Sequence, residues 1–414
     1  MVIAQSLLGI VVFIFIAWLL SENRRDFPVR VVAAGVLLQW GLAFCLLELS
    51  FFNQLFLLLN EGLLALEQAT QDGTRFVFGY LGGAELPFDE PYPGASFILA
   101  FRALPLILVI SALSALLFYW RMLPWVVKGF AWVLNKVMGI GGSVGLGAAA
   151  NIFVGMTEAP LLIKPYLERM TRGELFALMV TGMATIAGTM MVLYASILST
   201  LNSEVMGHIL TASVISVPAA LLFAAVMVPH QADVTVLDFD VPQTASSAMD
   251  AVTQGTLQGV KLLLNIIAML IVLIALVSLV NMLLALLPDI QGEPISLQRL
   301  LGFLLAPLVW LMGIPWAEAQ YAGSLMGIKT VLNEFLAYMD LAQQGVKELT
   351  ERSQLIMIYA LCGFANFGSL GIMLGGLSTL VPERRAEIAA LGLKSIVAGT
   401  LATMMTGAVV SVLL

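Results

Sequence analysis

Two glutamates lie in apolar segments of the sequence. Burying an ionised carboxylate there is energetically unfavourable, so each residue needs a structural or functional explanation. Glu158 belongs to residues 151–160 (NIFVGMTEAP), and Glu334 belongs to residues 329–338 (KTVLNEFLAY). A charge at the centre of a bilayer costs at least about 2.5 to 3.5 kcal/mol on insertion scales, so a carboxylate kept there indicates a functional site. The alternative is a structural carboxylate paired inside the protein, for instance Glu334 with nearby Lys329.

A second set of polar residues lies in apolar runs that glycines interrupt. Thr185 belongs to residues 181–189 (TGMATIAGT), and Asn366 and Ser369 belong to residues 362–369 (CGFANFGS). Where such a helix unwinds, free carbonyls with a hydroxyl and an amide offer hard oxygen ligands to a small cation, and hydrogen bonds to a polyhydroxylated solute. Alternatively, each hydroxyl only bonds its own helix or a neighbouring one.

The composition shows which elements must carry these residues. The 414 residues are 60% hydrophobic and 11% charged, with a mean hydropathy of +0.99, whereas soluble domains carry about 25% charged residues. Several uncharged runs reach the roughly 17 to 25 residues that cross a membrane as a helix. These runs are 103–120, 176–200, 209–229, 262–287 and 353–380. Because they do not alternate as the strands of a β-barrel would, they predict an all-α polytopic membrane protein.

The charge and the missing motifs exclude several classes of protein. With a formal net charge of −7 and no basic stripe, the chain is not expected to bind nucleic acid. It contains neither the His-Glu-x-x-His pattern of zinc proteases nor a glycine-rich phosphate loop ending in Lys-Ser or Lys-Thr. Transport must therefore draw on an ion gradient or on the solute itself, and we expect no organic cofactor.

Lysine and arginine indicate the orientation, because cytoplasmic loops are enriched in both. The first apolar run, residues 3–20, has no basic stretch before it and is expected to remain as the first span. The loop 23–30 is basic, which predicts an N-terminus outside the cell. We place the acidic residues 61–94 outside and the acidic residues 231–258 inside, the latter with an interfacial helix over 246–258 before the next span.

Two segments are predicted to be re-entrant hairpins. Residues 137–163 are apolar except for Glu158 and have basic residues on both sides, so both ends are expected on the cytoplasmic face. Residues 297–340, broken at 313–315 (GIP), have acidic flanks and are expected to enter from the opposite face. Each hairpin precedes a glycine-interrupted span. Such an inverted repeat is typical of the binding site of a secondary transporter.

This pattern divides the chain into four parts. Residues 1–120 hold the N-terminal spans of a scaffold. Residues 121–230 hold an interfacial helix, the first hairpin (about 137–168), an interrupted span and the span after it. Residues 231–290 hold a cytoplasmic segment, an interfacial helix and a scaffold span. Residues 291–414 hold the second hairpin (about 297–340), an interrupted span and the last span.

Three motifs in order resemble the concentrative nucleoside transporter family: GMTEAP at 155–160, NEFLAY at 333–338 and CGFANFGS at 362–369. The likeness covers roughly residues 95–414. It implies eight transmembrane helices, two oppositely oriented re-entrant helical hairpins, interfacial helices and a homotrimer in the bacterial inner membrane. The activity that it implies is symport of nucleosides such as uridine or adenosine into the cell by alternating access, with sodium as the co-transported ion.

The resemblance also implies the roles of single residues. Thr157 and Glu158 would contact the nucleobase, and Glu334, Asn366 and Ser369 the ribose hydroxyls. The whole substrate site would be Met156, Thr157, Glu158, Glu334, Phe364, Asn366 and Ser369. The sodium ligands would be Asn151, Val154, Thr185 and Ile186, with the valine and the isoleucine binding through their carbonyls. Many family members carry glutamine in place of Met156, so the preference between purines and pyrimidines stays open.

Two other functions fit the two carboxylates. One is a proton-coupled transporter of nucleosides or of another polar metabolite, because Glu158 or Glu334 could titrate. The other is an intramembrane enzyme that uses the two glutamates as acid and base, as glycoside hydrolases do. We expect a transporter and not an enzyme.

Overall fold

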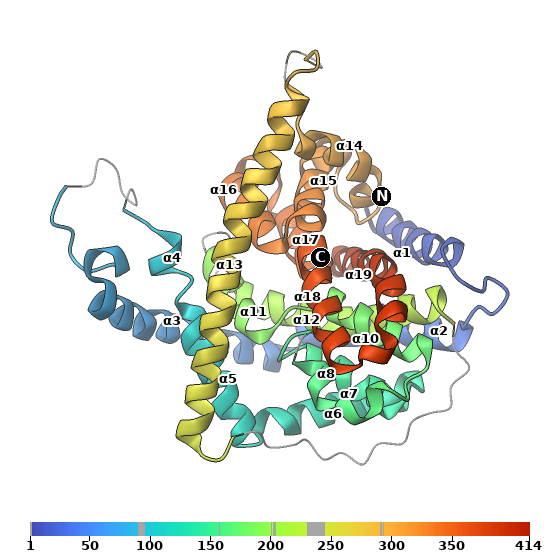
Figure 1. The fold of residues 1–414 in the computed structure, drawn as a ribbon. Helices are drawn as coiled ribbons and strands as arrows, with labels where there is room; N and C mark the ends of the chain where they lie inside the picture. Colours follow the sequence, from blue (N-terminus) through green and yellow to red (C-terminus); the bar gives the residue numbers. More distant parts are fainter. Residues whose placement is uncertain are drawn as a thin grey trace.

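The computed structural model describes residues 2–89, 96–156, 158–199, 201, 204–229, 245–289, 292 and 294–414, without the side chains of Ser50, Asn53 and Pro165. All regular structure in these ranges is helical (Figure 1). Seven of the helical segments there are long and apolar enough to cross a membrane. The expected all-α polytopic membrane fold is confirmed.

The N-terminal helices divide between two neighbourhoods. α1 (Val2–Leu19) and α2 (Val29–Glu48) pack against α12 (Val205–Met227) and α19 (Arg385–Leu413). α3 (Ser50–Phe78) and the short α4 (Leu99–Arg102) lead to α5 (Leu106–Tyr119), which lies along the long helix α13 (Ala248–Leu284; Figure 1). The core is carried mainly by helices in which most residues are buried: α10 (Arg172–Ala184), α12, α17 (Glu351–Leu361) and α19.

The first predicted hairpin is present. After α6 (Met122–Met138), the helix α7 (Gly142–Asn151) forms one arm, and the short helices α8 (Ala159–Leu162) and α9 (Lys164–Leu167) form the other. The expected interrupted span follows as α10 (Arg172–Ala184) and α11 (Gly188–Leu198). α10 begins with a capping box, in which Thr171 and Glu174 each accept a hydrogen bond from the other's backbone amide.

The second hairpin differs from the prediction of a single break at 313–315. That break separates α14 (Leu297–Trp310) from α15 (Trp316–Val331), but the chain turns again at residues 332–333 before α16 (Glu334–Glu348). The cause of the second turn is Asn333, whose side chain accepts a hydrogen bond from the Leu336 amide at 2.9 Å and so begins a new helix. Glu334 is thus the first residue of an arm and not the middle of one.

The segment 246–258, expected as an interfacial helix, is helical from Ala248 and continues directly into the span that follows it. α13 runs without interruption from Ala248 to Leu284, which is 37 residues and about 55 Å of helix. Its Gly255 and Gly259 do not break it but let α5 approach, since a Cβ at Gly255 would lie 2.6 Å from the Ser111 carbonyl oxygen. The two glycines therefore serve the close contact with α5 and do not end the helix.

The two interrupted spans cross at their breaks. The second one consists of α17 (Glu351–Leu361) and α18 (Phe367–Leu380), and its Phe364 amide donates to the Thr185 carbonyl in the break of the first. A Cβ at Gly363 would lie 3.0 Å from the Met183 carbonyl oxygen, so the missing side chain is what permits the crossing. The unwound backbone of both spans therefore lies inside the protein, as non-helical backbone at membrane depth must.

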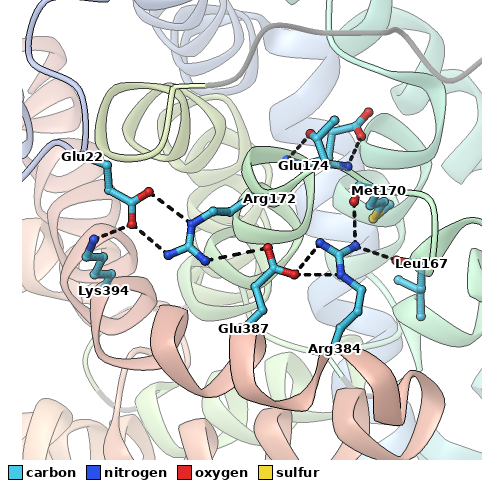
Figure 2. A network of polar contacts seen from close by, with 9 residues as sticks. Glu22, Leu167, Met170, Arg172, Glu174, Arg384, Glu387 and Lys394 are labelled. Carbon is cyan, nitrogen blue, oxygen red and sulfur yellow. Dashed lines mark hydrogen bonds and ion pairs between the residues drawn. The ribbon is translucent and has the colours of Figure 1, made fainter.

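A network of charges joins the start of α10, the start of α19 and the loop after α1 (Figure 2). The Arg172 guanidinium donates to both carboxylate oxygens of Glu22, and Lys394 donates to the same carboxylate at 2.6 Å. These partners, Arg172 foremost, lower the pKa of Glu22 to about 2. Arg384 pairs with Glu387 and also donates to two backbone carbonyls at the end of the first hairpin.

Candidate functional site

Glu158 lies just after the tip of the first hairpin. The chain turns there through Gly155 at a φ of 96°, a conformation that favours glycine. A Cβ at that position would lie 3.0 Å from both Glu158 Oε2 and the Ala187 Cβ. The glycine therefore lets the carboxylate lie close to the tip, where Glu158 is exposed to an internal cavity. Thr157 lies outside the described residues.

Glu334 is held by two donors inside the protein. Its side chain is 4% exposed. Tyr194 donates its hydroxyl to Oε1 at 2.5 Å, and Asn366 donates its amide to Oε2 at 2.8 Å. Lys329, the partner considered in the structural alternative, donates elsewhere, and no ion pair joins it to Glu334 in the described part of the chain. The carboxylate is thus fixed in place with lone pairs to spare.

Asn366 and Ser369 come from the start of α18. Asn366 caps this helix, because its Oδ1 accepts a hydrogen bond from the Ser369 amide at 2.7 Å. The cap fixes which way the amide group faces, so its Nδ2 must point at Glu334. Sequence motif and capping geometry together bring both residues to the second carboxylate.

Oxygen atoms gather between the first hairpin tip and the break of the following span. Thr185 donates to the Asn151 carbonyl at 3.3 Å and to the Thr181 carbonyl at 2.8 Å. Asn151 donates its amide to the Thr181 hydroxyl, while its buried Oδ1 has no hydrogen-bond partner among the residues that the structure describes. A buried acceptor without a donor is costly. It suits a hard cation, which carboxamide, carbonyl and hydroxyl oxygens bind.

The two hairpins meet at one cavity of about 690 Å³. Its size lies in the range of small-molecule sites. Every described residue of the predicted substrate site lines it. These are Met156, Glu158, Glu334, Phe364, Asn366 and Ser369. Val154 also lines it, whereas Asn151, Thr185 and Ile186 are buried behind the wall. The two carboxylates from the two hairpins therefore face a common space.

The cavity extends to a basic end of the molecule. Arg121 and Lys128, at the junction of α5 and α6, line it together with Lys261 of α13. Arg121 takes a positive φ of 61°, alone among the described non-glycine residues. Arg121 and Lys128 also precede the first hairpin, whose flanks the distribution of lysine and arginine predicts to be cytoplasmic.

Several lining residues carry no signal in the sequence. Tyr194, which holds Glu334, is a single tyrosine in an apolar run, and Asn265 is the single amide within the apolar residues 262–280 of α13. Both could have been found only as polar residues within spans, which more often bond a neighbouring helix than a solute. Only the position of each side chain at the cavity distinguishes a residue that can contact a solute from one that bonds a neighbouring helix.

Comparison with known proteins agrees with this geometry. Three family models match in succession: the N-terminus of Na+ dependent nucleoside transporters over residues 8–81, a nucleoside recognition region over 100–201, and the C-terminus of the same transporters over 208–411. The nucleoside permease NupC of Helicobacter pylori is 34% identical, covering 98% of this chain and 96% of the permease. The chain belongs to the concentrative nucleoside transporter family.

Other members of the family agree along the whole chain. Solute carrier family 28 member 3 of Homo sapiens is 32% identical over 98% of this chain and 59% of its own. The solved structure of CNTnw in an inward-facing substrate-bound state superposes with a TM-score of 0.90 at 34% identity, covering 100% of this chain and 98% of that one. A variant of CNTnw in an outward-facing state gives 0.89.

The family excludes one of the alternatives. Its members are permeases and transporters, so the interpretation of the two glutamates as the acid and base of an enzyme is wrong. The family model describes sodium-dependent transport of nucleosides. The same fold is solved in inward-facing, intermediate and outward-facing states of CNTnw.

Proposed function

We propose that this protein couples the entry of sodium to the uptake of nucleosides and works by alternating access. The observation that carries the proposal is the convergence of Glu158 and Glu334, from two different hairpins, on one cavity. Two carboxylates that face the same cavity favour a polar ligand that can donate hydrogen bonds to both. A nucleoside is such a ligand, because it carries ribose hydroxyls and polar groups on its base.

The ribose would bind at the buried end of the cavity. Glu334 retains lone pairs beyond its bonds to Tyr194 and Asn366, so it can accept ribose hydroxyls, and Ser369 lies next to it. Hydrogen bonds to an ionised carboxylate are the stronger kind. Glu158, with Thr157 and Met156, would face the nucleobase, and Phe364 would line the base pocket. Methionine donates no hydrogen bond, which favours a broad preference for purines and pyrimidines.

Sodium would bind between the first hairpin tip and the break after α10. The free Oδ1 of Asn151 supports this position, together with the Thr185 hydroxyl and the carbonyls of Val154 and Ile186. Sodium there would order the tip that carries Glu158 and so complete the nucleoside site. By linkage, sodium and nucleoside must then raise each other's affinity by the same factor.

The orientation follows from the basic end of the cavity. With Arg121 and Lys128 on the cytoplasmic side of a bacterial inner membrane, the cavity opens toward the cytoplasm. The N-terminus then lies on the outer side of that membrane. The hairpins and interrupted spans would move against a scaffold that includes α5 and α13. α13 leaves most of its apolar surface uncovered within the chain, which supports a homotrimer embedded in lipid with this helix near the contact.

Uptake into proteoliposomes tests the proposal. We expect labelled uridine or adenosine to accumulate under an inward sodium gradient and not when choline replaces sodium at constant pH. Accumulation that follows a proton gradient in choline would favour the proton-coupled alternative. Equal uptake without either gradient would refute symport.

The sodium site has its own test. Asn151→Ala removes the free oxygen and leaves the cavity wall, so the sodium concentration for half-maximal uptake should rise several-fold. Nucleoside affinity at saturating sodium should change little. Asn265→Ala, which removes an amide that lines the cavity from α13 and is not a proposed sodium ligand, is the matched control and should leave the sodium dependence unchanged.

A further inference from the structure

Lys329 is a fully buried cation whose hydrogen-bond partners among the described residues are neutral. It lies near the end of α15, and its side chain is 0% exposed. Its ammonium donates to the Ala360 carbonyl and to the Thr403 hydroxyl, both at 2.8 Å. Among the described residues, no carboxylate lies within ion-pair distance of it. A fully buried ammonium group without a carboxylate partner is energetically unfavourable, so its presence calls for a functional explanation.

The place that Lys329 occupies is the open end of a half-helix. Ala360 belongs to the last turn of α17, which ends at Leu361 where the span unwinds. The last carbonyls of a helix have no partner within it, and they form the negative end of its dipole. Lys329 therefore neutralises the end of a broken helix inside the membrane.

The first half of the chain has the same arrangement without a lysine. α10 ends at Ala184, where its span unwinds against the hairpin tip. The side chains there, Asn151 and Thr185, are neutral, and one buried oxygen has no donor. In broken transporter helices such carbonyl ends and unwound carbonyls are the places where coupling ions bind. Each half of the chain therefore presents a helix end whose carbonyls suit a cation. Among the described residues, the second half supplies that cation from a side chain and the first half does not.

We propose that the Lys329 ammonium is a tethered cation that fills the counterpart of the sodium site in the second half of the protein. The Ala360 carbonyl and the Thr403 hydroxyl, which hold it, are ligand types that also bind a small metal cation. The lysine keeps that position permanently occupied. One sodium ion then binds with each nucleoside, where an empty second position would admit two. This inference rests on sodium coupling in the proposed function.

Replacing the lysine by a shorter side chain tests the inference. Lys329→Ala exposes the two oxygens and leaves room for an ion. Nucleoside affinity would be measured by calorimetry on the purified protein, well below sodium saturation. In the wild type, we expect this affinity to rise with the first power of the sodium concentration. In the alanine variant, it should rise with the second power. In the alanine variant, methylammonium should increase nucleoside affinity and restore the first-power dependence on sodium concentration. It should have no effect on the wild type.

A second variant decides the case if the alanine variant does not fold. Lys329→Met fills the same space without a charge or room for an ion, so nucleoside affinity should fall at least about tenfold even in saturating sodium. If Lys329→Met binds nucleoside as tightly as the wild type, the proposal is refuted. It is also refuted if Lys329→Ala folds, keeps a first-power dependence on sodium concentration and does not respond to methylammonium. A wild type that shows no dependence on sodium would instead refute the coupling itself, and the methionine variant would still decide the role of the lysine.

Discussion

The sharpest prediction concerns Glu334→Gln, which removes a charge and keeps the shape of the site. Asn366 cannot turn its amide around without losing the cap on Ser369, so it keeps donating toward position 334. The new glutamine must therefore direct its own oxygen at Asn366 and its amide at Tyr194. The Tyr194 hydroxyl can rotate to accept. We expect the variant to fold with an intact cavity.

The magnitude follows from the kind of hydrogen bond that is lost. A bond to a charged group contributes about 1.5 to 3 kcal/mol, against about 0.5 to 1.5 kcal/mol for a neutral pair. If the ribose hydroxyls bind Glu334 as a carboxylate, the difference of about 1 to 1.5 kcal/mol per bond should lower nucleoside affinity by about 5- to 12-fold for each hydroxyl bound, since 1.4 kcal/mol corresponds to tenfold. Sodium affinity without nucleoside should stay the same, because no proposed sodium ligand contacts Glu334.

Calorimetry with three ligands separates a direct contact from a general disturbance. We would titrate the wild type and Glu334→Gln with uridine, 2′-deoxyuridine and 3′-deoxyuridine at saturating sodium. The analogue that lacks the contacted hydroxyl should bind both proteins with nearly equal affinity, as a double-mutant cycle requires. An equal loss for all three ligands, or uridine affinity within twofold of the wild type, would show that Glu334 does not hold the sugar.

Two further predictions follow from the fold. Gly188→Ala places a Cβ 2.8 Å from the Phe153 carbonyl oxygen and should raise the sodium requirement of uptake, because it displaces the hairpin tip; Gly41→Ala, with no atom within 4 Å, is the control and should leave uptake unchanged. Glu22→Gln should lower the melting temperature by an amount that is constant above pH 5 and vanishes as the pH falls from about 4.5 toward 2, because the folded-state pKa is depressed. A difference already lost at pH 5 would contradict the network in Figure 2.

Much of this fold could be predicted from the sequence, because a membrane restricts the choices. Apolar runs must be helices, and a carboxylate such as Glu158 must face protein or water. Glycine-interrupted spans were therefore recognisable at 182–188 and 363–371, and the structure breaks both spans there. The joint position of Glu334 and Asn366 is implied by the resemblance of their motifs to the family, and the structure brings the two side chains into contact.

The remaining features depend on contacts between distant segments. Gly255 and Gly259 suggest a break in a helix, yet their role is the close approach of α5, which no local pattern announces. The turn before Glu334 depends on one capping asparagine, a signal too common in loops to stand out. The partner of Lys329 is likewise a carbonyl and a hydroxyl on two other helices, although a glutamate lies close by in the sequence.

The two carboxylates that carry the proposal differ in their surroundings, and the difference suits a transporter. Glu334 is buried and held by Tyr194 and Asn366, so its geometry is set before any solute arrives. Glu158 is exposed to the open side of the cavity and follows a turn that depends on Gly155. We therefore expect a solute that leaves toward the basic end to lose its contact with the exposed Glu158 first and its contact with the buried Glu334 last. Because differential affinity between states is what moves an equilibrium, the hairpin tip with Glu158 is the element whose order we expect to change between the loaded and the empty protein.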